Sequence, residues 1–448
     1  MEDMKNGKRS SFSGKLGYVL AAAGASVGLG NIWRFPYLAA KYGGGIFLII
    51  YIVLALTFGY TMIVAETAIG RMTRKSPVGA FKSFGKKKWL SFGGWINAVI
   101  PVLIVPYYSV IGGWVIKYLV EYFRGNAKLL ADGVSTELCF VAFCAFTLII
   151  IFAGVQNGIE RVSKIMMPIL IVLSVIIAVY SVTRPGALAG VKYFLVPNVK
   201  NFSWMTVVSA MGQMFYSLSI AMGILITFGS YMKKDTAIED STRNVEIFDT
   251  GIAIMAGLMI IPAVFAFSGG DPDTLQAGPS LMFITIPKVF QNMGFGTVIG
   301  IVFFLLVLFA AVTSSIALTE SAVSTFEDEL GWGRKKATVL VGVIMLALGS
   351  LSSLGYGPLA GIKIIGMQFL DLFDFLTNSV MMPIAALLTS LFVSRVVGID
   401  KIEAEIIHGE SAFRRKKVFV VMIKYLCPVF AIIILLSSVA NALGWIKM

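Results

Sequence analysis

The sequence has 448 residues, of which 57% are hydrophobic and 14% are charged, and its mean hydropathy is +0.86. This balance excludes a soluble globular protein, and apolar runs along the whole length indicate one transmembrane domain over residues 1–448. The net charge of +13 would suit a nucleic-acid-binding protein, but the basic residues gather in alternate loops. That placement follows the positive-inside rule, so we expect a cell-membrane protein with a cytoplasmic N-terminus and no nucleic-acid partner.

Cysteine and histidine are scarce. The three cysteines, Cys139, Cys144 and Cys427, lie in apolar runs, and the single histidine, His408, lies in a polar loop. A zinc site, a disulfide framework or a histidine-based catalytic centre would have almost no residues to be built from. We therefore expect that the protein is not an enzyme.

About eleven runs are long and apolar enough to cross a bilayer as helices, for which about 20 residues suffice. They cover approximately residues 16–40, 45–70, 91–122, 137–154, 161–182, 205–231, 245–268, 293–325, 337–354, 366–394 and 418–444. The predicted fold is thus an all-α polytopic membrane protein whose C-terminus lies outside. Residues 271–291 predict an outer loop with short helices. Residues 398–417 fit either a surface amphipathic helix or a solvated connector.

The first run is interrupted near its middle by Gly28 and Gly30, with Arg34 and Pro36 close behind. Each glycine weakens a helix by about 1 kcal/mol relative to alanine. Lipid cannot satisfy backbone groups left unpaired at this depth, so they must line an enclosed cavity and bind something. Free carbonyls suit a small hard cation, and free amides at a helix N-terminus suit a carboxylate. A kinked helix whose glycines serve tight packing is the plainer alternative.

A second interruption, at residues 217–223, falls in the sixth run. Residues 16–182 and 205–394 hold five runs each, and residues 418–444 form an additional span. Because five is an odd number, the second set is expected to be inverted relative to the first. Broken helices at matching positions of two inverted repeats indicate a binding site near the membrane midplane.

The residues around the first interruption resemble a known signature. Gly24-Ala25-Ser26-Val27-Gly28-Leu29-Gly30-Asn31-Ile32-Trp33-Arg34-Phe35-Pro36-Tyr37, followed by Gly43-Gly44-Gly45, is similar to the signature of the neurotransmitter:sodium symporter family, in the form of a prokaryotic member. The resemblance implies a leucine-transporter-like fold with broken helices 1 and 6. It also implies sodium-coupled import of an amino acid by alternating access.

Two sodium ions are implied by the same resemblance. The first would be bound by Ser26, Asn31, Ser217, Asp249 and the carboxylate of the substrate. The second would be bound by Thr313 and Ser314, with the carbonyls of Gly24, Val27 and Ala310. Without the resemblance, hydroxyls of this kind inside an apolar helix could instead bond to their own backbone and bind nothing.

Asp249 is the main departure from the chloride-dependent relatives, which carry asparagine at this position. The chain keeps their tyrosine and glutamine as Tyr51 and Gln213, but Ala253 replaces a chloride-binding serine. A buried carboxylate can supply the negative charge that chloride would bring. We therefore expect chloride-independent transport, with a cytoplasmic helix cap as the alternative role for Asp249.

By resemblance, a pocket for the substrate would lie between the two interruptions. Its lining would be Ala25, Ser26, Gly28, Gly30, Ile104, Tyr108, Tyr216, Ser217, Ser219, Met222, Ser315 and Leu318. Tyr108 would bind the substrate's carboxylate, and Tyr216 would close over it. Since the lining is largely apolar, we expect a neutral, hydrophobic or small L-amino acid. Ala25 argues against a monoamine, for which relatives carry an acidic residue there.

Two charged pairs are expected to gate the pocket, Arg34 with Asp374 on the outside and Arg9 with Asp328 on the inside. Asp371, one turn from Asp374, is the alternative partner for Arg34. Arg9 fits nearly as well as one more positive-inside charge. Glu66, at membrane depth, is expected to accept donors from the broken backbone.

Three rival functions remain to be weighed. A channel or passive facilitator would need a continuous polar stripe, whereas here the polar residues cluster at one depth. A membrane enzyme would need a nucleophile beside a base, and the single histidine, in a polar loop, argues against one. A non-transporting amino-acid sensor of the same fold stays open as the alternative. We expect a monomer or a weak oligomer in the lipid bilayer.

Overall fold

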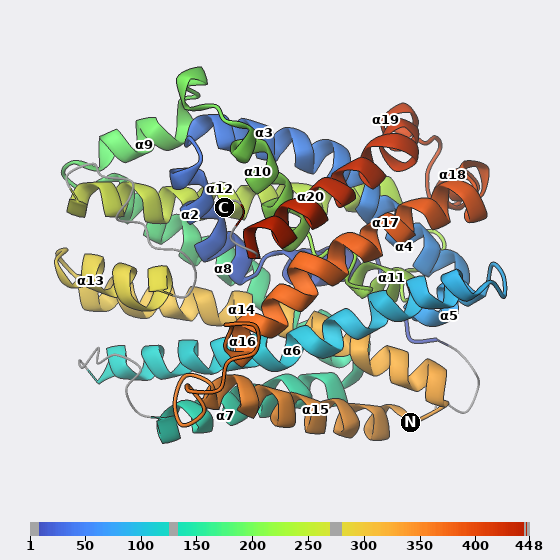
Figure 1. Cartoon of the computed structure of the whole chain (residues 1–448), viewed down its shortest axis with the longest axis horizontal. Helices are drawn as coiled ribbons and strands as arrows, with labels where there is room; N and C mark the ends of the chain where they lie inside the picture. Colours follow the sequence, from blue (N-terminus) through green and yellow to red (C-terminus); the bar gives the residue numbers. More distant parts are fainter. Residues whose placement is uncertain (1–8, 125–132, 269–279, 443–444, 446–448) are drawn as a thin grey trace.

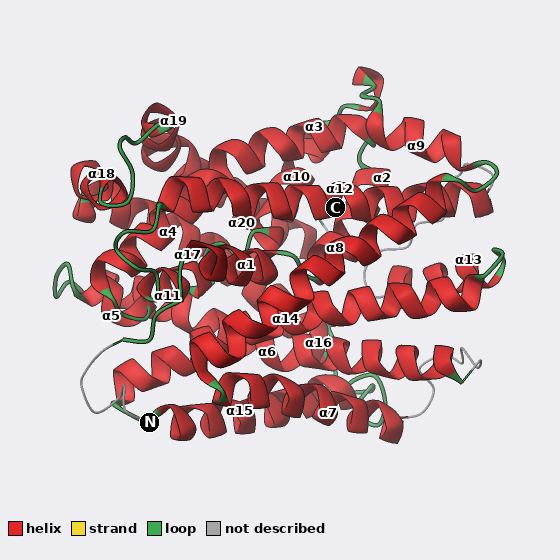
Figure 2. Ribbon diagram, turned by 180° about the vertical axis from the view of Figure 1, so that it is seen from behind, coloured by secondary structure: helices red, strands yellow, loops and turns green. Residues whose placement is uncertain are grey.

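The computed structural model describes residues 9–124, 133–268, 280–442 and 445. Within these residues all named elements are helices, and most of the long helices run side by side along the long axis of the molecule (Figure 1). Figure 2 shows the same arrangement from behind, with short loops joining the helices at the two ends. This architecture confirms the predicted all-α fold class.

Nine helical segments in the described part of the chain are long and apolar enough to cross a membrane, and a bent pair adds a tenth. The nine are Gly45–Thr73 (α3 and α4), Lys88–Phe123 (α6), Ser135–Phe152 (within α7, Gly133–Phe152), Val155–Val182 (η4 and α8), Ile238–Ser268 (α12), Gly296–Leu330 (α14), Arg334–Leu354 (α15), Phe369–Val397 (α16 and α17) and Lys416–Ala442 (α19 and α20). The bent pair is α1 (Lys15–Ser26) with Gly30–Lys41, which comprises the π-helical turn η2 (Gly30–Arg34) and α2 (Phe35–Lys41). Counting α10 (Trp204–Ser217) with α11 (Ile224–Ser230) as one broken span gives the predicted eleven.

The first span breaks where the glycines predict. Helix α1 ends at Ser26, Val27 is extended with ψ 93°, and helical structure resumes at Gly30. The two halves are bent by 52°. A Cβ on Gly28 would lie 2.6 Å from the Ser314 hydroxyl of α14, so the broken backbone approaches α14 as closely as only glycine permits.

The second break separates α10 from α11 over six residues. Ser219 and Ala221 have positive φ angles of 52° and 58°, which non-glycine residues rarely adopt. The amide of Ala221 donates a hydrogen bond to Glu66 Oε1 of α4 at 2.7 Å. This bond confirms the prediction that Glu66 accepts a donor from the broken backbone, and it helps hold the strained turn.

The broken helices lie in the interior of the bundle. Helix α1 contacts α8, α12 and α14, α10 contacts α3, and α11 contacts α4 and α14. In Figure 1, α7 and α15 lie along one edge of the molecule and α3 and α9 (Ala187–Leu195) along the opposite edge. Unpaired backbone groups at the two breaks therefore face protein and not lipid.

Short helices cover the ends of the bundle. Residues 281–291 form a π-helical turn and α13 (Ile286–Gln291), as expected for part of the predicted outer loop, whereas residues 271–279 lie outside the described part. Helix α18 (Ile399–Ile407) buries Ile402 and Ile406, so the amphipathic-helix alternative holds for the first half of residues 398–417, and a connector follows it. Helix α5 (Pro77–Lys82) packs on α6.

A buried ion pair fastens α18 to the bundle and yields a stability prediction. Arg71 of α4 is fully buried, and its Nε donates to Glu405 Oε1 at 2.8 Å. Lys234 also pairs with Glu405, at 2.8 Å, so the carboxylate would keep one partner without Arg71. Replacing Arg71 with alanine should still cost about 1–3 kcal/mol of unfolding free energy, because the carbonyls of Thr236 and Glu405 lose a buried donor. Thermal unfolding in detergent measures this.

The matched control is the exposed pair of Lys82 with Glu329, which lies 2.6 Å apart at the surface. K82A should change stability by only about 0–1 kcal/mol. Equal losses in R71A and K82A would show that the Arg71 pair does not anchor α18.

Candidate functional site

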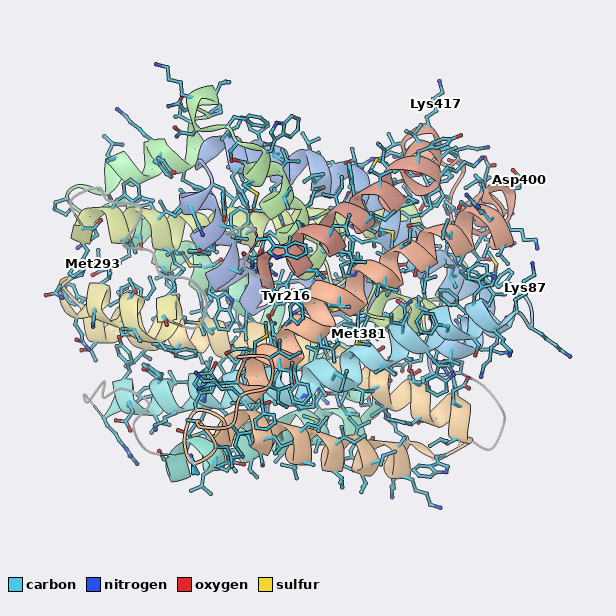
Figure 3. All side chains as sticks on the ribbon, in the orientation of Figure 1. Lys87, Tyr216, Met293, Met381, Asp400 and Lys417 are labelled. Atoms are coloured by element: carbon cyan, nitrogen blue, oxygen red, sulfur yellow. The ribbon has the colours of Figure 1, made fainter. Side chains whose placement is uncertain are left out.

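A small cavity of about 30 Å³ lies between the two helix breaks. It is lined by Ala25, Ser26, Gly28, Leu29, Gly30, Ile104, Tyr108, Tyr216, Ser219, Met222, Ser314 and Leu318. Figure 3 shows Tyr216 near the centre of the molecule, well away from Met293 and Lys87 at opposite ends of the long axis. The cavity therefore lies near mid-depth of the helical bundle.

The structure brings ten of the predicted pocket residues to this cavity but not Ser217 or Ser315. The prediction for Ser315 needs correction, because its hydroxyl faces α7 and lies 3.2 Å from that of Thr147. Its neighbour Ser314 faces the cavity instead, as the turn of about 100° per residue requires. Ser217 points to Asp249, on the far side of the break.

Polar groups in the cavity belong mainly to the interrupted backbone. The amide of Leu29 donates to the Tyr108 hydroxyl at 3.4 Å, and Ser219 Oγ donates to the carbonyl of Ala25 at 2.8 Å. The side chains of Ile104, Met222 and Leu318 supply apolar walls. A solute with one polar head and an apolar body fits such a lining.

Oxygen atoms converge where α1 meets α14. Ser314 Oγ lies 3.2 Å from the carbonyl oxygen of Gly24 and 3.5 Å from that of Val27. Thr313 Oγ1 lies 3.2 Å from the carbonyl of Ala310, and its Cβ would be 3.1 Å from a Cβ on Gly24. Ser314 Oγ and the carbonyls of Gly24 and Val27 thus form one group of hard oxygen donors. The Thr313 hydroxyl bonds within its own helix, to the carbonyls of Phe309 and Ala310.

A second group of oxygens surrounds Asp249, which is fully buried in α12. Its carboxylate accepts hydrogen bonds of 2.8 Å from Asn31 Nδ2, the Tyr51 hydroxyl and Ser217 Oγ. Since α12 spans Ile238–Ser268, Asp249 lies inside the helix, and the cap alternative is wrong. No basic side chain in the described part of the chain forms an ion pair with this carboxylate.

Ser26 and Gln213 bond to the interrupted backbone and not to this carboxylate. Ser26 Oγ donates to the carbonyl of Leu218 at 3.3 Å, beside Ser217. Gln213 Nε2 donates to the carbonyl of Gly30 at 3.0 Å. A buried negative charge with three hydrogen bonds and no basic partner is best stabilised by a small cation.

The inner charged pair is closed. Arg9 Nη1 lies 2.5 Å from Asp328 Oδ1, and its other nitrogens bond to Ser230 and Ser324. Below it, the ring of Phe12 packs against Phe228 and Tyr231. Arg9 therefore forms a specific ion pair with Asp328 and is not merely one more positive-inside charge.

The expected outer pair is not formed in this conformation. The Arg34 guanidinium lies over the ring of Tyr216, 5.1 Å from its centroid. Asp374 instead accepts from Asn378 at 2.6 Å and from Tyr107 at 3.3 Å. Arg34 and Asp374 both line a vestibule of about 470 Å³, so the protein is open above Tyr216 and closed below it.

Comparison with known proteins identifies the relatives of this chain. The profile of the sodium:neurotransmitter symporter family matches residues 9–131 and 121–444. The chain belongs to this family. The symporter's recognition signature at residues 24–37 therefore led to the correct family.

Individual relatives agree with this assignment. YhdH of Bacillus subtilis, described as an uncharacterised sodium-dependent transporter, is 33% identical over 450 residues, covering 97% of this chain and 99% of YhdH. The human sodium- and chloride-dependent GABA transporter 2 is 26% identical over 468 residues, covering 87% of this chain and 73% of that transporter. The crystal structure of MhsT in complex with L-phenylalanine matches with a TM-score of 0.86 at 34% identity, covering 96% of this chain and 100% of MhsT. The symporter is thus a sodium-dependent, multi-pass membrane transporter.

Some contacts of the symporter's site were not predicted from the sequence. Arg334 binds Glu320 at 2.5 Å beside the inner pair, although its place in a basic cluster indicated only topology. The backbone amide of Leu29 donates to the Tyr108 hydroxyl. This contact could not be predicted, because the leucine side chain gives no sign that its backbone takes part in the site. Glu160 accepts a hydrogen bond from Ser13, just before α1. The two residues are 147 positions apart, so no local sequence pattern indicates this contact.

Gly28 gives a direct test of the cavity. A methyl group there would meet Ser314 Oγ at 2.6 Å and the Tyr108 hydroxyl at 3.1 Å. We expect G28A to weaken sodium-dependent ligand binding by at least about tenfold, because the overpacked cavity must expand. Ligand-induced thermal stabilisation in detergent measures this binding.

Gly212 provides the control on the wall of the vestibule, where a Cβ would find only Arg34, at 4.0 Å. G212A should bind as the wild type does. Unchanged ligand binding in G28A would mean that the ligand site lies elsewhere.

Proposed function

We propose that this symporter imports a neutral, hydrophobic or small L-amino acid, driven by the inward sodium gradient. The observation that carries the proposal is the meeting of two broken helices with two oxygen clusters beside an apolar cavity. The relative MhsT was crystallised in complex with L-phenylalanine, an amino acid of this chemical class. The apolar side chains of Ile104, Met222 and Leu318 would contact the amino acid's side chain.

The amino acid's own charges would be matched by the helix ends. Its carboxylate would accept from the Tyr108 hydroxyl and from the amides near Gly28 and Gly30. Its ammonium group would face the carbonyls at the end of α1, near Ala25, and Tyr216 would close over it. Neither charge would then be buried without a partner.

Two sodium ions would occupy the two oxygen clusters. In the first site, Ser26, Asn31, Ser217 and Asp249 would bind an ion whose last ligand is the amino acid's carboxylate. In the second, Gly24, Val27, Ala310, Thr313 and Ser314 would hold an ion that fastens α1 to α14. Since the first ion and the carboxylate neutralise each other, each would bind better in the presence of the other.

Chloride would have no part in this cycle. Asp249 would supply the negative charge that chloride brings in other members. Its carboxylate already accepts a hydrogen bond of 2.8 Å from the Tyr51 hydroxyl. The described conformation, closed at Arg9–Asp328 and open at Arg34–Asp374, fits a state that admits sodium and substrate from outside.

Alternating access would exchange the two gates. Residues 16–182 and 205–394 would act as inverted repeats around the cavity, with 418–444 as an additional span. The symporter would work in the cell membrane with its N-terminus in the cytoplasm, as a monomer or weak oligomer. No chemical transformation is required of any residue.

Uptake into proteoliposomes tests the proposal. With an inward sodium gradient, a hydrophobic amino acid such as phenylalanine or leucine should accumulate above its external concentration, and replacing chloride with gluconate should not change the initial rate. Loss of uptake without chloride would contradict the role of Asp249. Sodium-dependent binding without any flux, including counterflow, would identify a sensor instead.

The matched control compares two aspartates. D249N should lower the apparent sodium affinity at least about tenfold, because a charge-assisted ligand is lost. D400N, at an exposed position of α18 (Figure 3), should leave uptake unchanged. Wild-type sodium affinity in D249N would exclude Asp249 as a ligand.

A further inference from the structure

A carboxylate from a distant part of the chain lies at the N-terminus of α1 and binds the residue just before its N-cap. Its own N-cap residue, Gly14, offers no side chain, and the first turn of α1 has no acidic residue. Instead, the amide of Ser13 donates to Glu160 Oε2 at 2.8 Å, and the Ser13 hydroxyl also donates to this carboxylate. Glu160 ends the π-helical turn Val155–Glu160 (η4), which leads into α8 (Arg161–Val182).

Glu160 is well suited to hold this helix end. Its side chain is only 3% exposed, and Lys164 pairs with it at 2.6 Å. A carboxylate near a helix N-terminus stabilises the unpaired amides and the positive end of the helix dipole. Hydrogen bonds to a charged acceptor of this kind are stronger than those between neutral groups.

The sequence of α1 leaves room for the carboxylate. A Cβ on Gly17 would lie 2.4 Å from the carboxyl carbon of Glu160, closer than side-chain atoms approach. Gly17 lies in the first turn of α1, where glycine is a weaker helix former than alanine, yet it permits this contact. The Glu160 carboxylate therefore packs directly against Gly17, where α1 meets the start of α8.

Neighbouring contacts hold the same segment from two sides. Gln156 of η4 donates to the carbonyl of Ser11 at 2.7 Å, and Lys233 donates to the carbonyl of Ser13 at 2.7 Å. The N-terminal segment is therefore held at Glu160 as well as at the Arg9–Asp328 pair, whose side chains are 15% and 23% exposed.

We propose that Glu160 is a positioning residue of the inner gate, which caps α1 from α8 and holds the inner half of the broken helix in its closed position. The proposal rests on the alternating-access function, because opening inward requires the start of α1 to leave its neighbours. Release of Ser13 from Glu160 would then be one step of inward opening. Lys164 would stay with Glu160 and keep its charge paired.

Two cysteine probes separate a change of conformational state from local loosening. Thr227 is buried in α11, one turn before Tyr231, whose ring packs against Phe12 below the inner charged pair. The Thr227 hydroxyl lies 3.4 Å from that of Ser321, which is one turn beyond Leu318 of the cavity. Ser438 lines the outer vestibule. T227C should react with a soluble thiol reagent only in the inward-open state, and S438C most rapidly in the outward-open state.

In this assay E160Q should raise the T227C labelling rate about tenfold and lower the S438C rate, because the neutral amide loses the charge-assisted cap. G17A should do the same, since its methyl group displaces the carboxylate. Alanine is the better helix former, so a purely structural effect on α1 would run in the opposite direction. The double variant should shift no further than either single variant.

E329Q, in the exposed pair with Lys82, is the matched control and should match the parent carrying the same probe. Faster T227C labelling in E160Q with unchanged S438C labelling would indicate local fraying and overturn the proposal, as would a G17A variant that labels like the parent. If sodium alters neither probe in the wild-type background, alternating access itself fails. If sodium alters both probes but E160Q and G17A do not, only the role of Glu160 fails.

Discussion

Backbone groups without partners inside a membrane constrain this structure more than any side-chain contact. A helix that stops at Ser26 and resumes at Gly30 exposes carbonyls and amides that lipid cannot satisfy. The second break, after Ser217, is buried opposite the first, and Glu66 satisfies one of its amides. The long helices around them exclude lipid, so the remaining polar groups are available to a cation and a polar solute.

Electrostatics then determine what these groups can hold. Asp249 places a negative charge at the first break, where it has hydrogen bonds but no basic partner in the described part of the chain. Closure of one end of the pathway at a time prevents the site from leaking. In the described conformation Arg9 and Asp328 form the inner closure, and the cap on α1 by Glu160 belongs to the same set of contacts.

Much of this could be predicted from the sequence, because the informative residues are local. The glycines at 28 and 30, the run of hydroxyls at 313–315 and the length of each apolar run specify the spans, the breaks and the family. Rotation about α14 was not predictable at single-residue precision, so Ser315 was placed in the pocket and Ser314 was not. The state of the Arg34–Asp374 pair depends on conformation, and the contact of Glu160 with Ser13 depends on tertiary packing, so the sequence signals neither.

The central claim is that the two helix breaks bind sodium and an amino acid as one coupled unit. Equilibrium binding of a hydrophobic amino acid, measured by calorimetry over a series of sodium concentrations, tests this most directly. The account predicts that amino-acid affinity rises with sodium concentration, and that the amino acid raises sodium affinity by the same factor. Amino-acid binding that is equally tight with and without sodium would contradict it.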